Sequence, residues 1–229
     1  MLVKDWMHPD VITIDANFSM HHANKLMKEH NIRMLPVVKK GKLVGIVTDR
    51  DLKRASASDA NSLLTHELVY LLKKLKIKKI MTKNPITIPF DYTTEETAQI
   101  LKDNKISGAP VVDKKGRMVG VITQTDIFRV MISLTGIVKK GIQFAFVIED
   151  QPGTIKELTD IIRAYDGRMV SILSSYDNVK KGYRKVYIRA HSIERSSLAN
   201  LKEDMQRKGE ILYMVDHRDD IREIYTKHE

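Results

Sequence analysis

Two Thr-x-x-Asp pairs have the residue types and spacing to bind a polar ligand. Thr48 and Asp51 recur as Thr123 and Asp126, and each pair stands where an apolar, strand-like run gives way to a segment with helical spacing. A Thr hydroxyl can donate a hydrogen bond, a carboxylate can accept several, and the free N–H groups of a helix N-terminus favour an anion. Each pair could instead only cap its own helix. Its occurrence twice in register favours ligand binding.

The two pairs belong to a tandem repeat in the N-terminal half of the chain. Residues 7–52 are written again, with variation, at 81–127. In each copy the pattern predicts a short extended piece, a helix, a β-hairpin and a second helix, in the order β-α-β-β-α. Two copies of one unit usually pack together and enclose a pseudo-symmetric cleft, so we expect two related sites. The counterparts of Met7, Pro36, Gly45, Thr48 and Asp51 are Met81, Pro110, Gly120, Thr123 and Asp126.

The C-terminal third has a different pattern. Residues 143–148 predict a strand, and Asp150-Gln151-Pro152-Gly153 predicts a tight turn into an amphipathic helix. Two strands, a second helix and a last strand are expected to follow, which gives the β-α-β-β-α-β order of a ferredoxin-like fold. The whole chain is therefore expected to have a mixed fold class, with α+β and α/β features.

Five segments are expected along the chain: a first repeat at 1–61, a linker helix at 62–80, a second repeat at 81–135, a C-terminal domain at 141–217 and a tail at 218–229. The linker carries an apolar helical stripe that has no counterpart in the second copy. We expect this stripe to pack on the repeats or on a second subunit. It consists of Leu64, Leu68, Leu71, Leu72 and Leu75.

Composition indicates a soluble protein without disulfides. The formal net charge is +10, which favours anionic partners, and the chain has no Cys. We expect no membrane span and no secretion signal, which together favour the cytoplasm. No helix-turn-helix, zinc-finger or interleaved aromatic pattern accompanies the charge, so nucleic-acid binding is not expected.

The sequence lacks patterns typical of catalysis and of metal binding. It contains no G-x-x-x-x-G-K-[ST] loop, no G-x-S-x-G motif and no G-x-G-x-x-G motif. The eight His do not have metal-ligand spacing, since His21 and His22 are adjacent and would point to different sides of a helix. We therefore expect no enzyme activity, no catalytic residues, no catalytic cofactor and no metal site.

Gly45-Ile-Val-Thr-Asp-Arg-Asp and its second copy, Gly120-Val-Ile-Thr-Gln-Thr-Asp, resemble the cystathionine-β-synthase (CBS) domain. The upstream Pro-Val-Val and Met-x-x-x-x-Ile-Thr patterns extend the resemblance over about residues 1–132. It implies that the pair of repeats binds an adenosine-containing ligand in two clefts, and that two such modules associate. The expected ligands are AMP, ADP, ATP, S-adenosylmethionine and NAD(H).

The resemblance also implies which residues form the clefts. The acid at the start of each helix would accept ribose hydroxyls, the Thr three residues earlier would bind ribose or phosphate, and adenine would lie in an apolar slot. The first cleft then comprises Ile12, Thr13, Ile14, Ile32, Arg33, Met34, Thr48, Arg50 and Asp51. The second comprises Ile86, Thr87, Ile88, Ile106, Ser107, Gly108, Thr123 and Asp126. More positive charge in the first cleft predicts polyphosphate there and a less charged adenosine ligand in the second.

Asp150-x-Pro-Gly, followed by Gly167, makes the C-terminal third similar to an ACT domain. The chain departs from the frequent Gly-x-Asn-Ile pattern, because Arg, Met and Val follow Gly167. The resemblance implies pairing between two copies or an amino-acid ligand, and both alternatives stay open. The candidate ligand residues are Asp150, Gln151, Gly153 and Thr154. The order CBS, CBS, ACT is similar to AcuB-type proteins, named for acetoin utilisation.

These expectations favour a non-enzymatic, homodimeric sensor of adenosine nucleotides, with a role in acetoin or carbon metabolism implied only by the resemblance. A dimeric scaffold whose clefts hold no physiological ligand is the alternative. The sequence leaves open which ligand enters which cleft, whether an amino acid binds, which protein target is regulated and how the dimer is built.

Overall fold

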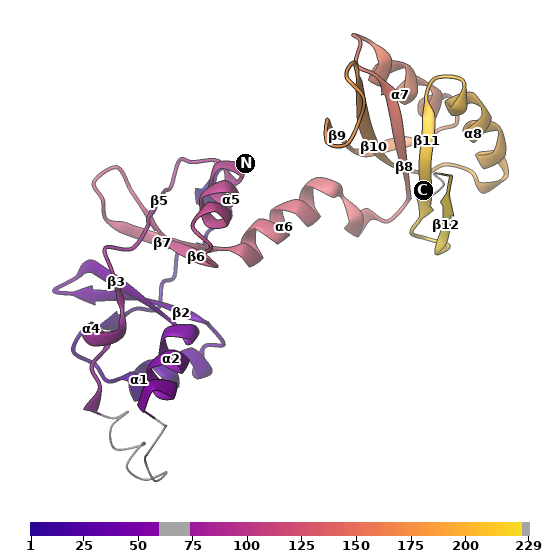
Figure 1. The fold of residues 1–229 in the computed structure, drawn as a ribbon. Coiled ribbons are helices and arrows are strands. Elements are labelled where there is room, and N and C mark those ends of the chain that lie inside the picture. The colour runs from indigo at the N-terminus through magenta and orange to yellow at the C-terminus, as the bar shows by residue number, and fades with distance from the viewer. Residues whose placement is uncertain (60–73, 226–229) are drawn as a thin grey trace. The chain divides into compact units, whose positions relative to one another are not determined.

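The structure, a computed structural model, describes residues 1–59 and 74–225 in two compact units that divide after Val130 (Figure 1). Most of the predicted leucine stripe lies outside the described residues, but Leu75 packs against the core of the first repeat. In the described parts of the chain, no helix has both the length and the hydropathy that a membrane span requires.

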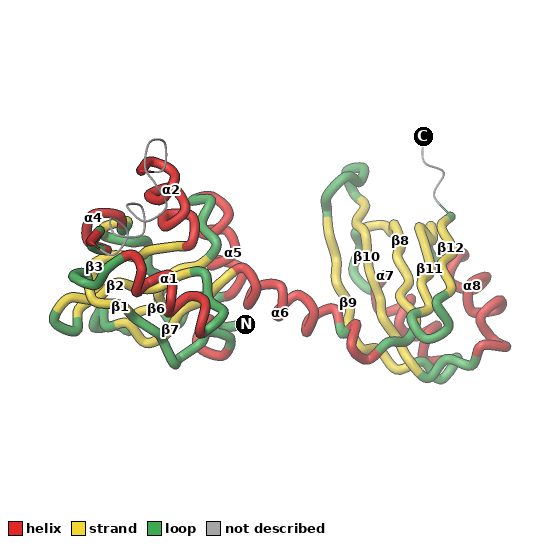
Figure 2. Tube along the Cα trace, turned by 90° about the horizontal axis from the view of Figure 1, so that it is seen from below, coloured by secondary structure: helices red, strands yellow, loops and turns green. Residues whose placement is uncertain are grey.

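The first repeat has the predicted β-α-β-β-α order. Its elements are β1 (Ile14–Asp15), α1 (Met20–Glu29), β2 (Met34–Lys39), β3 (Lys42–Thr48) and α2 (Asp49–Asp59). β1 runs parallel to β2, and β2 forms an antiparallel hairpin with β3. Figure 2 shows the three strands side by side. Ser19 caps α1, because its Oγ accepts a hydrogen bond from His22 N at 3.3 Å. The apolar faces of both helices join one core with β2, β3 and β1.

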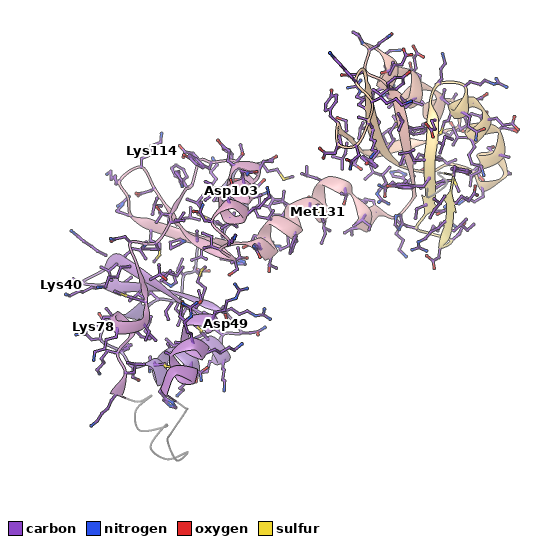
Figure 3. All side chains as sticks on the ribbon, viewed as in Figure 1. Lys40, Asp49, Lys78, Asp103, Lys114 and Met131 are labelled. Atoms are coloured by element: carbon purple, nitrogen blue, oxygen red, sulfur yellow. The ribbon has the colours of Figure 1, made fainter. Side chains whose placement is uncertain are left out.

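The second repeat has the same order, and its first helix has a more complete N-terminal cap. Its elements are β5 (Ile88–Pro89), α5 (Thr94–Asp103), β6 (Gly108–Val112), β7 (Met118–Thr123) and α6 (Gln124–Thr135). Thr93 and Glu96 form a reciprocal capping box at the start of α5. Lys40 and Lys114 occupy equivalent positions at the turns of the two hairpins, where Figure 3 shows them at the outer edge of the unit.

Two short arms are exchanged between the repeats. The N-terminal arm, residues 1–8, packs on the second repeat and places Val3 in its core, fully buried. The central arm, residues 76–83, packs on the first repeat and places Ile77 in that core, also fully buried. The arms contain η1 (Val3–Asp5), α4 (Ile77–Ile80) and β4 (Thr82–Lys83), of which β4 pairs with β3. Each repeat is therefore completed by the arm that precedes the other repeat in the sequence.

Two glycines let the arms approach the sheets. At Gly45 in β3, an added methyl group would lie 2.6 Å from Met81 Sδ and 2.9 Å from the next carbonyl oxygen of the central arm. At Gly120 in β7, it would lie 2.5 Å from Met7 Sδ and 3.0 Å from the next carbonyl oxygen of the N-terminal arm. The glycines and methionines that recur in the sequence thus meet each other across the two copies.

The C-terminal unit has the predicted β-α-β-β-α-β order plus one strand. Its elements are η3 (Ile137–Lys139), β8 (Ile142–Glu149), α7 (Thr154–Ala164), β9 (Arg168–Ser175), β10 (Tyr183–His191), η4 (Arg195–Ser197), α8 (Leu198–Gln206), β11 (Glu210–Asp216) and β12 (Ile221–Ile224). The sheet is antiparallel, in the order β12-β11-β8-β10-β9. Its first strand, β8, lies beside its third, β10, as the predicted ferredoxin-like fold requires. α7 and α8 pack around Phe144 and Phe146. The sequence did not predict β12, because four residues are too short for a clear alternating pattern.

Candidate functional site

The two Thr-x-x-Asp pairs lie where β3 runs into α2 and where β7 runs into α6. Thr48 N and Oγ1 donate hydrogen bonds to Asp51 Oδ2 at 2.9 and 2.7 Å. Thr123 N and Oγ1 donate to Asp126 Oδ2, also at 2.9 and 2.7 Å. In return, each Asp N–H donates to the Thr hydroxyl, at 3.3 and 3.4 Å. Both pairs therefore cap their helices through Oδ2, which leaves Oδ1 as the oxygen that could receive a ligand.

The surroundings of Oδ1 differ between the two copies. Asp51 is half-buried, and its Oδ1 makes no hydrogen bond or ion pair with any residue that the structure describes. Asp126 is fully buried, and its Oδ1 lies 3.0 Å from His8 Nε2 and 3.1 Å from Arg129 NH1. The first cleft thus offers an open acceptor, whereas the second offers an occupied one. Sequence reasoning missed His8, which comes from the exchanged arm.

Backbone hydrogen bonds hold the segments before β2 and β6 at the same two turns. Asp49 N donates to Arg33 O at 3.0 Å, and Gln124 N donates to Ser107 O at 2.9 Å. The side chains of Arg33 and Ser107 are exposed, as is that of Arg50 on the first turn of α2. These predicted residues are therefore brought together with the Thr–Asp pairs.

The two candidate clefts also adjoin each other. A methyl group on Gly108 would lie 3.1 Å from Met34 Cε and 2.9 Å from Ile122 O, so only a glycine fits without displacement. Ile32, Met34 and Ile106 are half-buried beside this contact. The segments before β2 and β6 therefore lie close together at this point.

The side chains of the first extended pieces differ in how far they are exposed. Ile14 and Ile88 are 1% and 0% exposed in the cores of the two repeats, so only their backbone groups could contact a ligand. Ile12, Thr13 and Thr87 are half-buried, and Ile86 is 40% exposed.

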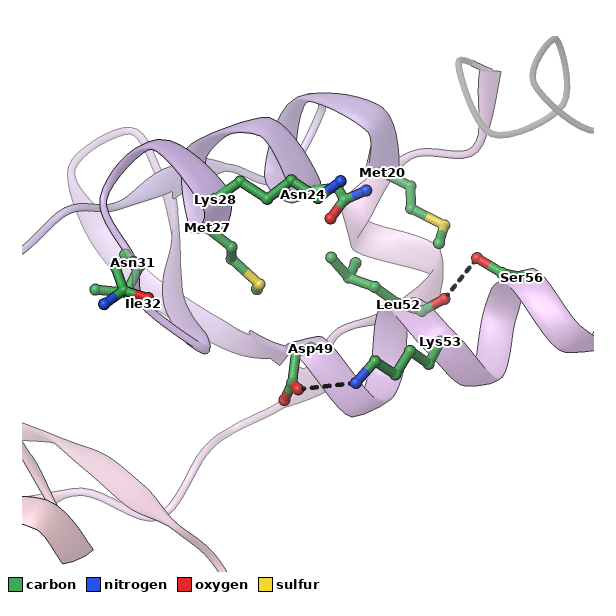
Figure 4. A pocket seen from close by; sticks show the side chains of 10 residues that line it. All are labelled: Met20, Asn24, Met27, Lys28, Asn31, Ile32, Asp49, Leu52, Lys53 and Ser56. Carbon is green, nitrogen blue, oxygen red and sulfur yellow. Dashed lines mark hydrogen bonds and ion pairs between the residues drawn. The ribbon is translucent and has the colours of Figure 1, made fainter.

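A groove of about 540 Å³ lies beside the first cleft, between α1 and α2 (Figure 4). Met27 and Leu52 form its apolar floor, and Lys53 Nζ lies 3.4 Å from Asp49 Oδ2 at its rim. Among the predicted site residues, Ile32 alone lines it. The lining residues are Met20, Asn24, Met27, Lys28, Asn31, Ile32, Asp49, Leu52, Lys53 and Ser56.

In the C-terminal unit, the predicted turn residues gather around an arginine that the sequence did not single out. Arg184 Nε lies 3.4 Å from Asp150 Oδ1, and its NH2 donates to Thr154 Oγ1 at 3.4 Å. The Arg184 side chain is 17% exposed, and its Nε is buried without a hydrogen-bond partner. Gln151 and Gly153 are exposed. The turn therefore presents a guanidinium with spare donor capacity, which could bind a carboxylate.

A second groove of the C-terminal unit, of about 910 Å³, is distinct from that turn. Its basic lining includes Lys139, Lys140 and Arg195, of which Arg195 Nε lies 2.7 Å from Asp216 Oδ2. Among the described residues, no group of three or more His, Asp or Glu side chains is placed to hold a metal ion.

Comparison with known proteins identifies the N-terminal unit. Residues 3–58 and 77–133 match the CBS domain model. A CBS domain-containing protein of Dictyostelium discoideum is 34% identical over 135 residues, which are 58% of this chain and 93% of that protein. An inosine-5'-monophosphate dehydrogenase of Korarchaeum cryptofilum is 40% identical over 119 residues, which are 52% of this chain but 22% of the enzyme. The chain thus spans about a fifth of that enzyme's length.

A solved structure with a similar sequence is the CBS domain pair of protein MJ0100, in complex with 5'-methylthioadenosine and S-adenosyl-L-methionine. It is 38% identical, with a TM-score of 0.49, and the match covers 57% of this chain and 95% of that one. The family model fits both repeats, and the Dictyostelium protein is matched over almost its whole length. The chain therefore belongs to the CBS-domain family and carries a tandem CBS pair.

Proposed function

We propose that this chain is a non-catalytic sensor whose CBS pair binds an adenosine-containing nucleotide at the two Thr–Asp turns. The observation that carries the proposal is the open Oδ1 of Asp51, which lies beside the Thr48 hydroxyl at the start of a helix. This oxygen can accept a ribose hydroxyl without displacing a described protein donor. The candidate ligands are AMP, ADP, ATP, S-adenosylmethionine and NAD(H).

Charge supports a phosphorylated ligand in the first cleft. Arg33 and Arg50 are exposed at the β3–α2 turn, where the helix N-terminus also favours an anion. At the equivalent turn of the second repeat, Ser107 is neutral, and Gln124 Nε2 donates to Ile106 O at 3.2 Å. We propose polyphosphate in the first cleft and a less charged adenosine ligand in the second.

The C-terminal unit is proposed to be an ACT domain that supports a homodimer or binds a second small ligand. Arg184, Asp150 and Thr154 together present a cation, an anion and a hydroxyl, a set that matches the ends of a free amino acid. A cytoplasmic role in acetoin or carbon metabolism and the AcuB-type assignment rest on the sequence resemblance. A dimeric scaffold without a physiological nucleotide is the competing proposal.

A thermal-shift panel of the candidate adenosine compounds and the twenty amino acids tests this function. A ligand at about 100 times its Kd adds about 2.7 kcal/mol of stability, which a melting curve detects readily. We expect a nucleotide to raise the Tm of the wild type and Asp51→Ala to abolish the shift from the first cleft. Asp126→Ala is the matched variant for the second cleft. If no compound raised the Tm, the scaffold proposal would replace the sensor.

A further inference from the structure

We infer that His8 gates the second cleft, so that a nucleotide fills the first cleft first and must displace His8 from Asp126 to enter the second. The inference rests on the proposed function, because it concerns the ribose acceptors of the same two clefts. It adds an order of filling and names the residue that imposes the order.

The acceptor capacity of Asp126 is fully used by the protein. A carboxylate has about four lone-pair positions. Thr123 N and Oγ1 donate to Oδ2, Arg129 NH1 donates to Oδ1, and His8 Nε2 lies 3.0 Å from Oδ1. The Asp126 side chain is 1% exposed. A ribose hydroxyl can therefore bind there only by displacing one of these groups, whereas no described residue donates a hydrogen bond to Asp51 Oδ1.

Of the two side chains beside Asp126 Oδ1, His8 can leave at less cost to the fold. Its backbone is fixed on β7, because His8 N donates to Val121 O at 2.9 Å and Val121 N donates to His8 O at 3.0 Å. Its side chain, in contrast, is 61% exposed and can rotate away without moving the arm. Arg129 is held more firmly, since its guanidinium also lies over the Trp6 ring, 5.8 Å from the centroid.

The first cleft lacks this gate because the central arm carries different side chains. Ile80 and Thr82 stand where the N-terminal arm has Trp6 and His8. Thr82 pairs with Ile46 as His8 pairs with Val121, so the backbone placement is the same. The structure shows no hydrogen bond between Thr82 and Asp51 among the residues it describes. The difference between the two clefts therefore comes from the side chains of the arms and not from the Thr–Asp pairs.

Isothermal titration calorimetry with AMP, and in parallel with ATP, can test the gate. In the full chain, Asp51→Ala leaves an acceptor only in the second cleft, and Asp126→Ala leaves one only in the first. We expect His8→Ala, added to Asp51→Ala, to tighten nucleotide binding about tenfold, the size of one charge-assisted hydrogen bond. Added to Asp126→Ala, it should change nothing. Thr82→Ala, at the equivalent place in the central arm, is the control and should leave both affinities unchanged.

The outcomes separate the gate from the proposed function. Equal affinities with and without His8→Ala in the Asp51→Ala protein would overturn the gate. Nucleotide binding by the Asp126→Ala protein would still support the proposed sensor function. Loss of binding by every variant and by the wild type would overturn both. A second readout is the imidazole NMR signal of His8, which we expect to shift as the second cleft fills. An unchanged signal at saturation of both clefts would contradict displacement.

Discussion

Asp51 and Asp126 occupy equivalent positions but have unequal structural roles. Asp51 caps α2 through Oδ2, while Asp126 caps α6, accepts a hydrogen bond from Arg129 and lies 3.0 Å from His8 Nε2. We expect Asp51→Ala to lower the free energy of unfolding by about 1 kcal/mol, the usual value of a helix cap. Asp126→Ala should cost about 1 to 2 kcal/mol, because it also removes the partner of Arg129 and His8, whose exposed side chains add only the value of surface ion pairs. Urea denaturation of both variants measures the difference, and an equal or reversed order would contradict it.

The sequence could predict the Thr–Asp pairs because both members lie within one turn, where spacing alone brings them together. It could not predict that His8 reaches Asp126, or that Arg184 reaches Asp150. Those contacts join segments far apart in the chain, and they depend on arm exchange and on the pairing of β10 with β8. Local spacing therefore predicts candidate ligand-binding residues. The protein groups that compete with a ligand for those residues become visible only in the three-dimensional structure.

At the scale of elements, the stability of each repeat depends on the arm that precedes the other repeat in the chain. Val3 fills the core of the second repeat and Ile77 that of the first. We expect each change to Ala to cost about 2 kcal/mol, the value of a buried aliphatic side chain. Hydrogen exchange should then show Val3→Ala loosening β6 and β7, and Ile77→Ala loosening β2 and β3. Each variant is the control for the other, and loosening of the repeat that directly follows the mutated arm would refute the exchange.

The helices and hairpins were predictable because their apolar residues recur over ten or so positions and their turns carry Gly or strong caps. The exchanged arms were not, since η1, α4 and β4 are too short to show a period. Nothing in the sequence of the N-terminal arm tells which repeat it joins. Gly45 and Gly120 indicated part of this arrangement, because a glycine inside a strand predicts that another segment approaches closely. The glycines do not tell which segment that is.

At the scale of the whole molecule, the C-terminal unit needs the end of α6 as part of its fold. Arg189 is 3% exposed, and burial lowers its pKa. Its Nε donates to Thr135 O at 2.9 Å, and its NH2 donates to Gln143 Oε1 at 2.7 Å. We expect a fragment of residues 131–229 to fold and one of 141–229 to be less stable by about 2 to 3 kcal/mol, because a buried cation loses a partner. Arg189→Met should rescue the shorter fragment in chemical denaturation. Equal stability of the two fragments would show that the predicted start at 141 suffices.

The exchange of arms also affects how the chain is made. The last described residue of the first repeat is 59, yet that repeat lacks Ile77 until the central arm has emerged from the ribosome. The N-terminal arm finds its binding site later still, because Val3 stays exposed to water until β6 and β7 are synthesised. Domains usually fold one after another as they emerge. Here the first repeat can complete its core only after the central arm has emerged, and the second only after β6 and β7 have joined the N-terminal arm, so a ribosome stalled before residue 77 carries an unfinished core.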